Sequence, residues 1–259
     1  ELQARLLSLL APGAMAYLAA IPRTNRFRLT SGPMISALCT DLGLPQPALV
    51  GVRTCRCGAT LDNFGHHYRS VCSQRGLRKA AHNNVVDEHV AMLKTVFAPN
   101  QVIREHGRHH GYSPNWRPDI TVWNFDGRGT HMIIDVSIAD PTCASYRRQA
   151  AATPLAAAAK HEERKTRLYQ GDPAGASYPA CGNHEFVPLA YELYGGRGSA
   201  AQKWFEDLRS RRHNRLRQET EDATWSARTF GAYWTQRIGC AMKRTVGFQL
   251  TMQAHQDFV

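Results

Sequence analysis

The chain has 259 residues, of which 43% are hydrophobic and 20% charged, a composition that supports a folded core and excludes an intrinsically disordered protein. Its 32 lysines and arginines against 21 aspartates and glutamates leave a net charge of +11, which predicts a polyanionic partner: nucleic acid first, an anionic membrane surface second. No apolar run reaches the roughly 18 residues of a membrane span, so no transmembrane segment is expected.

The cysteine content favours a reducing compartment. Seven cysteines are an odd number in a chain too large to need disulfide bonds, which indicates that some of them bind metal. The first residue is Glu1 rather than methionine, and we expect the chain to be part of a longer polypeptide.

Four segments of different character follow one another along the chain. Residues 1–51 have a helical pattern that Pro and Gly interrupt. Residues 52–82 concentrate Cys, His and Gly, as a small metal-binding module does. Residues 83 to about 170 contain the strand patterns, and residues 171–259 are interrupted by Gly and Pro at first and are then charged and helical in pattern.

The third segment predicts a helix, a hairpin and a second helix. Periodic apolar residues predict a helix over 83–97. Two runs with β-forming residues, at 120–125 and 130–138, flank an Asp-Gly sequence that is typical of hairpin turns. The Ala-rich residues 150–169 predict the second helix. This order predicts an α/β (α+β) fold in which a sheet packs against helices.

The metal prediction concerns residues 55–72. A structural Zn²⁺ site takes four nitrogen or sulfur ligands, usually delivered as two close pairs. Two such pairs are predicted to bind one zinc: Cys55 with Cys57, and His67 with Cys72. The alternatives are His66 in place of His67, His82 as a further ligand, or a loop of free cysteines. Four protein ligands leave no open position for water, so this zinc would be structural.

A second constellation joins two aspartates and a lysine. Asp135 stands in the middle of an apolar strand, where a charged side chain is costly unless it is paired or bound to metal. Asp119 precedes the neighbouring strand, and Lys160 and Lys165 lie on the following helix. Two carboxylates and a lysine are what Mg²⁺-dependent phosphodiester hydrolysis uses. The structural alternative has Asp119 capping a turn and Asp135 paired with an arginine.

The pairing register of the hairpin decides whether the two aspartates meet. A two-residue turn places Ile120 opposite Asp135 and scatters the apolar residues over both faces. A three-residue turn, with Gly129 in a left-handed conformation, pairs 120 with 134 and 119 with 135. The apolar side chains then share one face and the aspartates share the other, with Cβ atoms about 5 Å apart. The hydrophobic pattern selects this second register.

The order of these motifs resembles the C-terminal part of non-LTR retrotransposon proteins, which carry a restriction-like endonuclease of the PD-(D/E)xK superfamily behind a reverse transcriptase. The similar motifs are Cys-x-Cys-Gly at 55–58, Gly-x-His at 65–67, Arg-Pro-Asp at 117–119, Asp-Val-x-Ile at 135–138 and Tyr-Trp-Thr-Gln-Arg at 233–237. The resemblance implies a helical linker region at 1–51, a CCHC-type zinc knuckle at 52–82 and a basic helical extension at 201–259. Between them, residues 83–200 would form a restriction-endonuclease-like core, a mixed sheet flanked by helices.

The same resemblance implies an activity: a DNA endonuclease that nicks the target site so that the polymerase can prime on the freed end. Asp119 and Asp135 would be the catalytic acids that bind Mg²⁺ or Mn²⁺. Ser137 replaces the lysine normally found two positions after the central acid. The resemblance places the lysine on the next helix, where we favour Lys165 over Lys160. No polymerase motif of the Tyr-x-Asp-Asp kind occurs in the chain.

The partners expected from the resemblance are DNA and, second, the RNA of the element, in the nucleus and within a larger reverse transcriptase polypeptide. No membrane partner is expected. Arginines of the Arg-Pro-Asp motif and of a later basic run are predicted to contact phosphates: Arg117, Arg209, Arg211, Arg212 and Arg215. Two rival functions are a catalytically inactive, zinc-containing remnant that only binds nucleic acid, and a domesticated host module that binds RNA.

Overall fold

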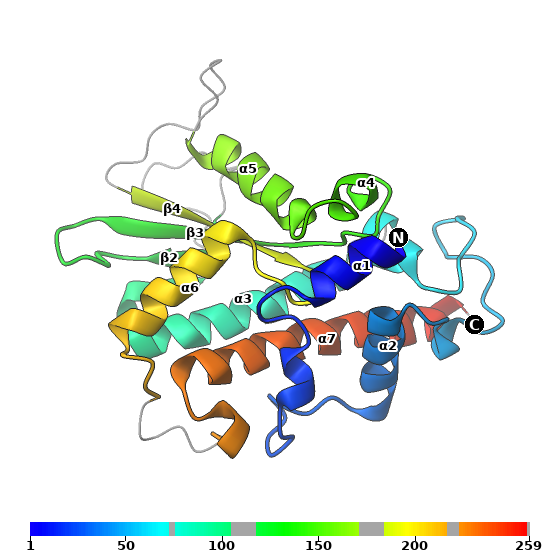
Figure 1. Cartoon of the computed structure of the whole chain (residues 1–259), viewed down its shortest axis with the longest axis horizontal. Coiled ribbons are helices and arrows are strands. Elements are labelled where there is room, and N and C mark those ends of the chain that lie inside the picture. The colour runs from blue at the N-terminus through cyan, green and yellow to red at the C-terminus, as the bar shows by residue number, and fades with distance from the viewer. Residues whose placement is uncertain (73–75, 105–117, 171–183, 217–222, 258–259) are drawn as a thin grey trace.

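The computed structural model describes residues 1–72, 76–104, 118–170, 184–216 and 223–257. It confirms the predicted mixed α/β class, with one four-stranded mixed sheet packed against helices (Figure 1). Within the described residues, no helix is both long enough and apolar enough to cross a membrane.

The sheet has the strand order β1-β2-β3-β4. β1 (Val102–Arg104), β2 (Ile120–Val122) and β3 (His131–Ala139) pair in antiparallel fashion. β4 (His184–Glu192) runs parallel to β3 and follows α5 (Ala156–Gln170) in the chain. A parallel neighbour requires a crossover connection, and α5 lies in that connection and packs on both β3 and β4.

The hairpin of β2 and β3 has the register that the hydrophobic pattern predicts. Ile120 pairs with Ile134, and both side chains are buried. Continued by one residue, this register brings Asp119 opposite Asp135. The main-chain nitrogen of Val136 donates a hydrogen bond of 2.6 Å to Asp119 Oδ2. The first carboxylate is therefore held against the strand that carries the second.

The connection between β2 and β3 is longer than the predicted three-residue turn. β2 ends at Val122 rather than at Phe125, because Asn124 adopts a left-handed conformation (φ +46°) that an extended strand excludes. The Asn124 side chain accepts a hydrogen bond of 2.6 Å from the Gly129 nitrogen. Gly129 has φ +90°, so the predicted left-handed glycine is confirmed, but within a longer loop.

Replacing Gly129 with valine should destabilise the fold by about 1–2 kcal/mol, because a side chain in the left-handed region brings its Cβ too close to the following carbonyl oxygen. A Cβ at Gly129 would meet no heavy atom within 4 Å, so the strain is confined to the backbone. The denaturant midpoint measures the loss. Arg128→Val, at a neighbouring position without positive φ, is the control. An equal loss in both variants would contradict the argument from φ.

Two helices differ from their predicted bounds. The helix predicted over 83–97 begins earlier, as α3 (Gly76–Val96), so the last residues of the predicted 52–82 segment are helical. The helix predicted over 150–169 begins later, as α5 at Ala156, and a separate short helix, α4 (Arg147–Ala150), ends where the predicted helix was to begin. Pro154 explains the later start, because proline lacks the amide hydrogen and disfavours helical backbone in the residue before it.

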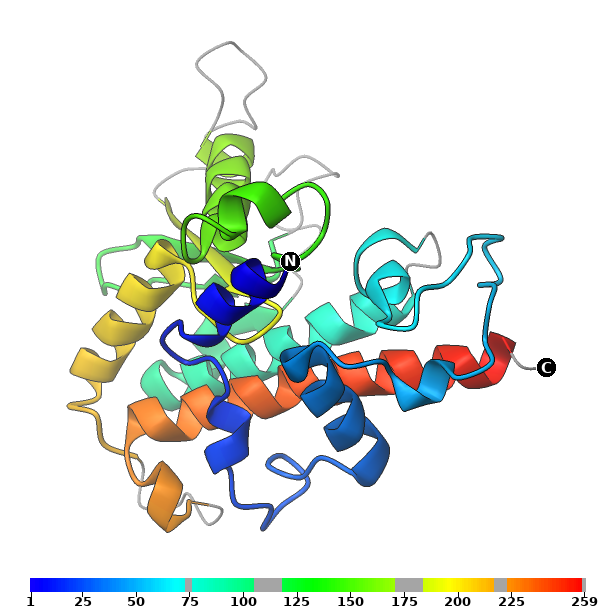
Figure 2. The same ribbon diagram turned by 45° about the vertical axis from the view of Figure 1, so that its right-hand side comes forward.

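The C-terminal helix α7 (Phe230–Asp257) packs between two other helices. It lies alongside α3 and α2 (Ser31–Leu42), as both views show (Figures 1 and 2). Gly247 permits the close approach to α2, since a Cβ there would lie 2.3 Å from the Cα of Pro33. Side chains of α7 therefore belong to the hydrophobic core that also covers the sheet.

Two further helices pack on α4 and on β4. α1 (Leu2–Leu9) packs on α4, and α6 (Ser199–Arg211) packs on β4. Short helical segments complete the described part of the chain: η1 (Ala16–Ala19), η2 (Pro47–Leu49), the π-helix η3 (His67–Val71), η4 (Pro99–Gln101) and η5 (Trp225–Ala227).

Candidate metal centre and acidic cluster

A group of three cysteines and one histidine lies between η2 and α3. Its members are the four predicted ligands, Cys55, Cys57, His67 and Cys72, and their ligand atoms lie within 4.8 Å of one another. The sulfurs of Cys55 and Cys72 are 3.7 Å apart, and the Cys57 sulfur is 3.2 Å from His67 Nε2. These residues are named the Cys3His group, and residues 52–72 the Cys/His module.

The distances fit a tetrahedral zinc site. Zn–S bonds of about 2.3 Å and Zn–N bonds of about 2.0–2.1 Å place two sulfur ligands about 3.8 Å apart, and a sulfur and a nitrogen about 3.5 Å apart. Burial raises the pKa of the Cys55 thiol to about 12, so binding of zinc would release a proton from it. The Cys3His group could therefore hold a structural zinc, with all four coordination positions filled by the protein.

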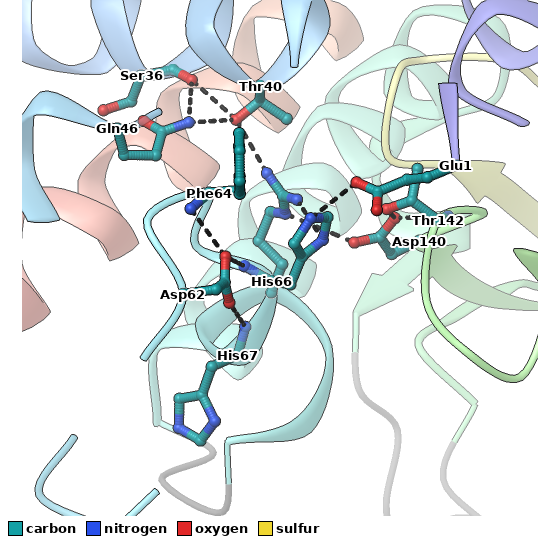
Figure 3. A network of polar contacts seen from close by, with 11 residues as sticks. Glu1, Ser36, Thr40, Gln46, Asp62, Phe64, His66, His67, Asp140 and Thr142 are labelled. Atoms are coloured by element: carbon teal, nitrogen blue, oxygen red, sulfur yellow. Dashed lines mark hydrogen bonds and ion pairs between the residues drawn. The ribbon is translucent and has the colours of Figure 1, made fainter. Parts of the chain in front are cut away.

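Local backbone geometry brings the four ligands together. Thr54 and Thr60 form an isolated β-bridge around the Cys-x-Cys turn, and Gly58 takes φ +84° within it. Asp62 then orders the second pair of ligands, since its Oδ2 accepts a hydrogen bond of 3.3 Å from the His67 nitrogen (Figure 3). The π-helix η3 begins at this histidine, and its single turn carries the chain to the fourth ligand.

The alternative ligands His66 and His82 lie elsewhere. His66 Nδ1 is 2.9 Å from an Arg69 guanidinium nitrogen, and its Nε2 is 2.9 Å from the Glu1 carboxylate. The rings of His66 and His67 diverge, the first toward Glu1 and the second away from it (Figure 3). His82 lies on α3, outside the group. His67 is therefore the histidine that the fold brings to the three cysteines.

Arg69 ties the Cys/His module to the rest of the fold. Its side chain is buried, and its Nε lies 3.5 Å from the carboxylate of Asp140, which directly follows β3. Its Nη1 donates a hydrogen bond of 3.2 Å to Thr40 on α2. Asp140 is oriented in turn by the Thr142 hydroxyl, which donates a hydrogen bond of 2.6 Å (Figure 3). One arginine that the sequence patterns did not single out thus joins the module to α2 and to the sheet.

Asp119, Asp135 and Lys165 come together from three different parts of the chain. Asp135 is buried in the middle of β3, and Lys165 of α5 forms an ion pair with its Oδ2. Asp119 stands directly before β2. Lys160, the other candidate, has its ammonium 5.8 Å from the centre of the Tyr146 ring. Lys165 is therefore the lysine that contacts Asp135. The three residues are named the Asp–Lys cluster.

The two carboxylates have pKa values displaced in opposite directions. Burial, and then the charge of Asp119, raise the pKa of Asp135 to about 6, although Lys165 lowers it. Burial also raises the pKa of Asp119, but the interactions with His82 and the Val136 N–H outweigh it and leave this pKa below its ordinary value. The pair therefore concentrates negative charge that a cation would balance.

His82 is a neighbour of the cluster that sequence reasoning missed. Its Nε2 is 3.1 Å from Asp119 Oδ2 and 3.0 Å from the carbonyl oxygen of Val136. Burial lowers the pKa of His82, but the hydrogen bond and charge of Asp119 raise it more, so the net pKa lies above its ordinary value. Both neighbours are acceptors, so Nε2 carries the hydrogen. His82 lies close in sequence to a Cys-rich segment. The sequence therefore suggested that it binds zinc rather than that it contacts Asp119.

The predicted phosphate contacts lie at the end of α6, just beyond it, or outside the described residues. Arg117 is not among the described residues. The basic run at the end of α6 and just beyond it contains Arg209, Arg211, Arg212 and Arg215. Arg209 pairs with Glu206 at 2.6 Å, and the Arg211 guanidinium lies 6.0 Å from the centre of the Phe125 ring in the β2–β3 loop. In Figure 1 this end of α6 lies across the molecule from the Cys/His module.

Two features of the described residues can carry chemistry: the Cys3His group and the Asp–Lys cluster. No protein-family model matches the chain, and no curated protein does. The function is therefore inferred from the geometry of these two features.

Proposed function

We propose that the protein is a DNA endonuclease that hydrolyses a phosphodiester bond with the help of Mg²⁺ or Mn²⁺. The observation that carries the proposal is the Asp–Lys cluster, in which Lys165 is ion-paired to Asp135 while Asp119 is hydrogen-bonded to the same strand. A charged aspartate among buried apolar residues is costly, and such perturbed groups concentrate at functional sites.

The residues present fit a divalent cation. Lys165 engages one oxygen of Asp135, and the Val136 N–H engages one oxygen of Asp119, which orients both carboxylates. Enzymes bind Mg²⁺ through one or two carboxylates, with water and substrate phosphate oxygens completing the coordination shell. Asp119 and Asp135 would hold the ion, which would supply positive charge to the phosphate and lower the pKa of a water.

Lys165 and His82 would have separate roles beside the metal ion. Lys165 places a positively charged hydrogen-bond donor beside Asp135, where it can orient a water or stabilise charge on the phosphate. His82 holds Asp119 from the side of α3. In the reaction, the water oxygen bonds to phosphorus, one P–O bond breaks, and the leaving oxygen takes up a proton.

The biological role follows from the resemblance to retrotransposon endonucleases. The nick would provide the end on which the reverse transcriptase of a larger polypeptide begins synthesis, in the nucleus. The net charge of +11 supports DNA as the substrate and the element RNA as a second partner, because lysines and arginines release counterions from the phosphate backbone. The Cys3His group would be the zinc knuckle of that family, and the basic run after α6 would add phosphate contacts.

Nicking of supercoiled plasmid tests the proposal. The zinc-loaded chain should produce open-circular plasmid in Mg²⁺ and none without it, and Asp135→Asn should lower the rate by about 10²–10³-fold or more. Asp207→Asn, at an exposed position of α6, makes the same change of charge away from the cluster and is the matched control. Magnesium is omitted rather than chelated, because a chelator would also remove zinc.

A chain that binds plasmid without nicking it, with or without Asp135→Asn, would contradict the endonuclease. That result would instead favour the rival function, a catalytically inactive zinc-containing module that binds nucleic acid. Nicking that Asp135→Asn leaves unchanged would place the active site elsewhere in the chain.

A further inference from the structure

Two neighbouring cavities lead from the Cys/His module to the Asp–Lys cluster. The larger has a volume of about 710 Å³ and lies between the module, the chain after β3 and the helix α5. The smaller has a volume of about 260 Å³ and reaches His82 and Lys165. Both are lined by Arg69, Ile138 and Arg164, so they adjoin at these residues. Together they are named the groove.

The acidic side chains that line the groove are balanced by their neighbours. Asp140 faces the buried guanidinium of Arg69. The Asp62 carboxylate accepts hydrogen bonds from the main-chain nitrogens of Phe64, His66 and His67. Glu1 accepts a hydrogen bond of 2.9 Å from His66 Nε2. The three carboxylates are therefore held by neighbouring donors, and the charge of Asp140 is compensated by Arg69.

Two arginines of the lining have no such partner. Arg147, at the start of α4, and Arg164, on α5, are exposed, and neither forms an ion pair with any residue that the structure describes. Arg164 directly precedes Lys165 and lines both cavities. The groove thus carries positive charge along the approach to the Asp–Lys cluster, where a polyanion would be attracted.

The groove also presents an aromatic side chain. Tyr146 is half-buried in the lining of the larger cavity, and its hydroxyl lies 3.0 Å from His161 Nε2. Burial, and then the charges of Arg164 and Lys165, lower the pKa of His161 to about 4, so this ring is neutral at physiological pH. A basic groove with an aromatic ring is typical of single-stranded nucleic-acid binding, because phosphates meet the cations and a base stacks on the ring.

We infer that the groove binds a single strand of DNA and delivers it to the Asp–Lys cluster. The inference rests on the proposed function, because it names the substrate strand of that site. Arg147 and Arg164 contact the phosphates of the strand, and Tyr146 lines the passage. The Cys/His module forms the opposite wall, so zinc shapes the passage without taking part in hydrolysis. Small-molecule pockets of this size are lined mainly by apolar side chains, whereas the lining of the larger cavity is mostly polar and charged.

Fluorescence anisotropy with a labelled thymidine oligomer of about 15 nucleotides tests the inference. The zinc-loaded Asp135→Asn chain is used without Mg²⁺, so that the strand is not cleaved. Arg147→Ala with Arg164→Ala should weaken binding at least about tenfold. It should also flatten the slope of log affinity against log salt by about 1.4, because each phosphate contact on a single strand contributes about 0.7.

The matched control is the pair Arg148→Ala with Arg167→Ala. These residues lie on the same two helices, α4 and α5, and are exposed, but neither lines the cavities. The control removes the same charge and should change affinity less than about twofold. The pair Arg147→Lys with Arg164→Lys keeps the charge and should bind within about threefold of the parent.

Equal losses in both alanine pairs would overturn the inference, and so would a lysine pair as weak as the alanine pair. If Arg147→Ala with Arg164→Ala weakens binding of a blunt duplex as much as binding of the oligomer, the single strand is overturned as the occupant.

The groove and the endonuclease can be refuted independently of each other. The expected binding results without any plasmid nicking would refute the endonuclease alone. Nicking at the parental rate by Arg147→Ala with Arg164→Ala would refute the groove alone.

Discussion

Replacing Lys165 with alanine should lower the rate of plasmid nicking by about 10²–10³-fold, whereas Lys160→Ala should leave it within about twofold. The Lys165 ammonium is ion-paired to Asp135, whereas the Lys160 ammonium lies against the Tyr146 ring. Both lysines belong to α5, and both substitutions remove one positive charge. The comparison therefore separates proximity to the carboxylates from a general loss of charge.

The measurement is the single-turnover rate at saturating plasmid, so that changes in DNA affinity do not enter. Lys165→Arg is a further variant: it keeps the charge but replaces a compact ammonium by a planar guanidinium, and we expect about a tenfold loss. Equal rates for Lys165→Ala and the parent would contradict the role of the Asp–Lys cluster. A loss in Lys160→Ala alone would contradict only the assignment of the lysine.

Replacing Cys72 with serine should remove the zinc and unfold the Cys/His module while the hairpin of β2 and β3 persists. Structural zinc sites have apparent binding free energies of about 10–16 kcal/mol at pH 7, and this energy is folding energy of the segment that supplies the ligands. Unfolding of the module would also withdraw Arg69 from the buried carboxylate of Asp140, which would then lack its charge partner. The hairpin is held by its own ladder and by α5, so it does not depend on the module.

Elemental analysis and hydrogen exchange check this prediction. The parent chain should contain one zinc, and Cys72→Ser should contain none and lose amide protection over residues 52–72 while β3 stays protected. Cys39→Ser, at a half-buried cysteine outside the Cys3His group, is the control and should keep its zinc. A parent chain without zinc, or a module that remains protected in Cys72→Ser, would contradict a structural zinc here.

Features that depend on local pattern were predictable from the amino-acid sequence. The four members of the Cys3His group lie within one short segment, so their spacing was enough to identify them. The register of the hairpin followed from alternation, because only one pairing puts the apolar side chains of both strands on a common face. The same alternation was therefore sufficient to predict that Asp119 lies opposite Asp135. The longer loop was missed because the β-forming run was continued through Asn124, although asparagine adopts a left-handed conformation more readily than most residues.

Contacts between elements that are distant in the chain depended instead on tertiary packing. His82 meets Asp119 across 37 residues because α3 packs on the sheet with that side chain facing the hairpin. Arg69 reaches Asp140, and Arg164 lines the groove, because the Cys/His module and α5 lie on either side of the end of β3. Local periodicity shows which face of a helix is apolar, but the position of one element against another depends on how all the packed side chains fit together.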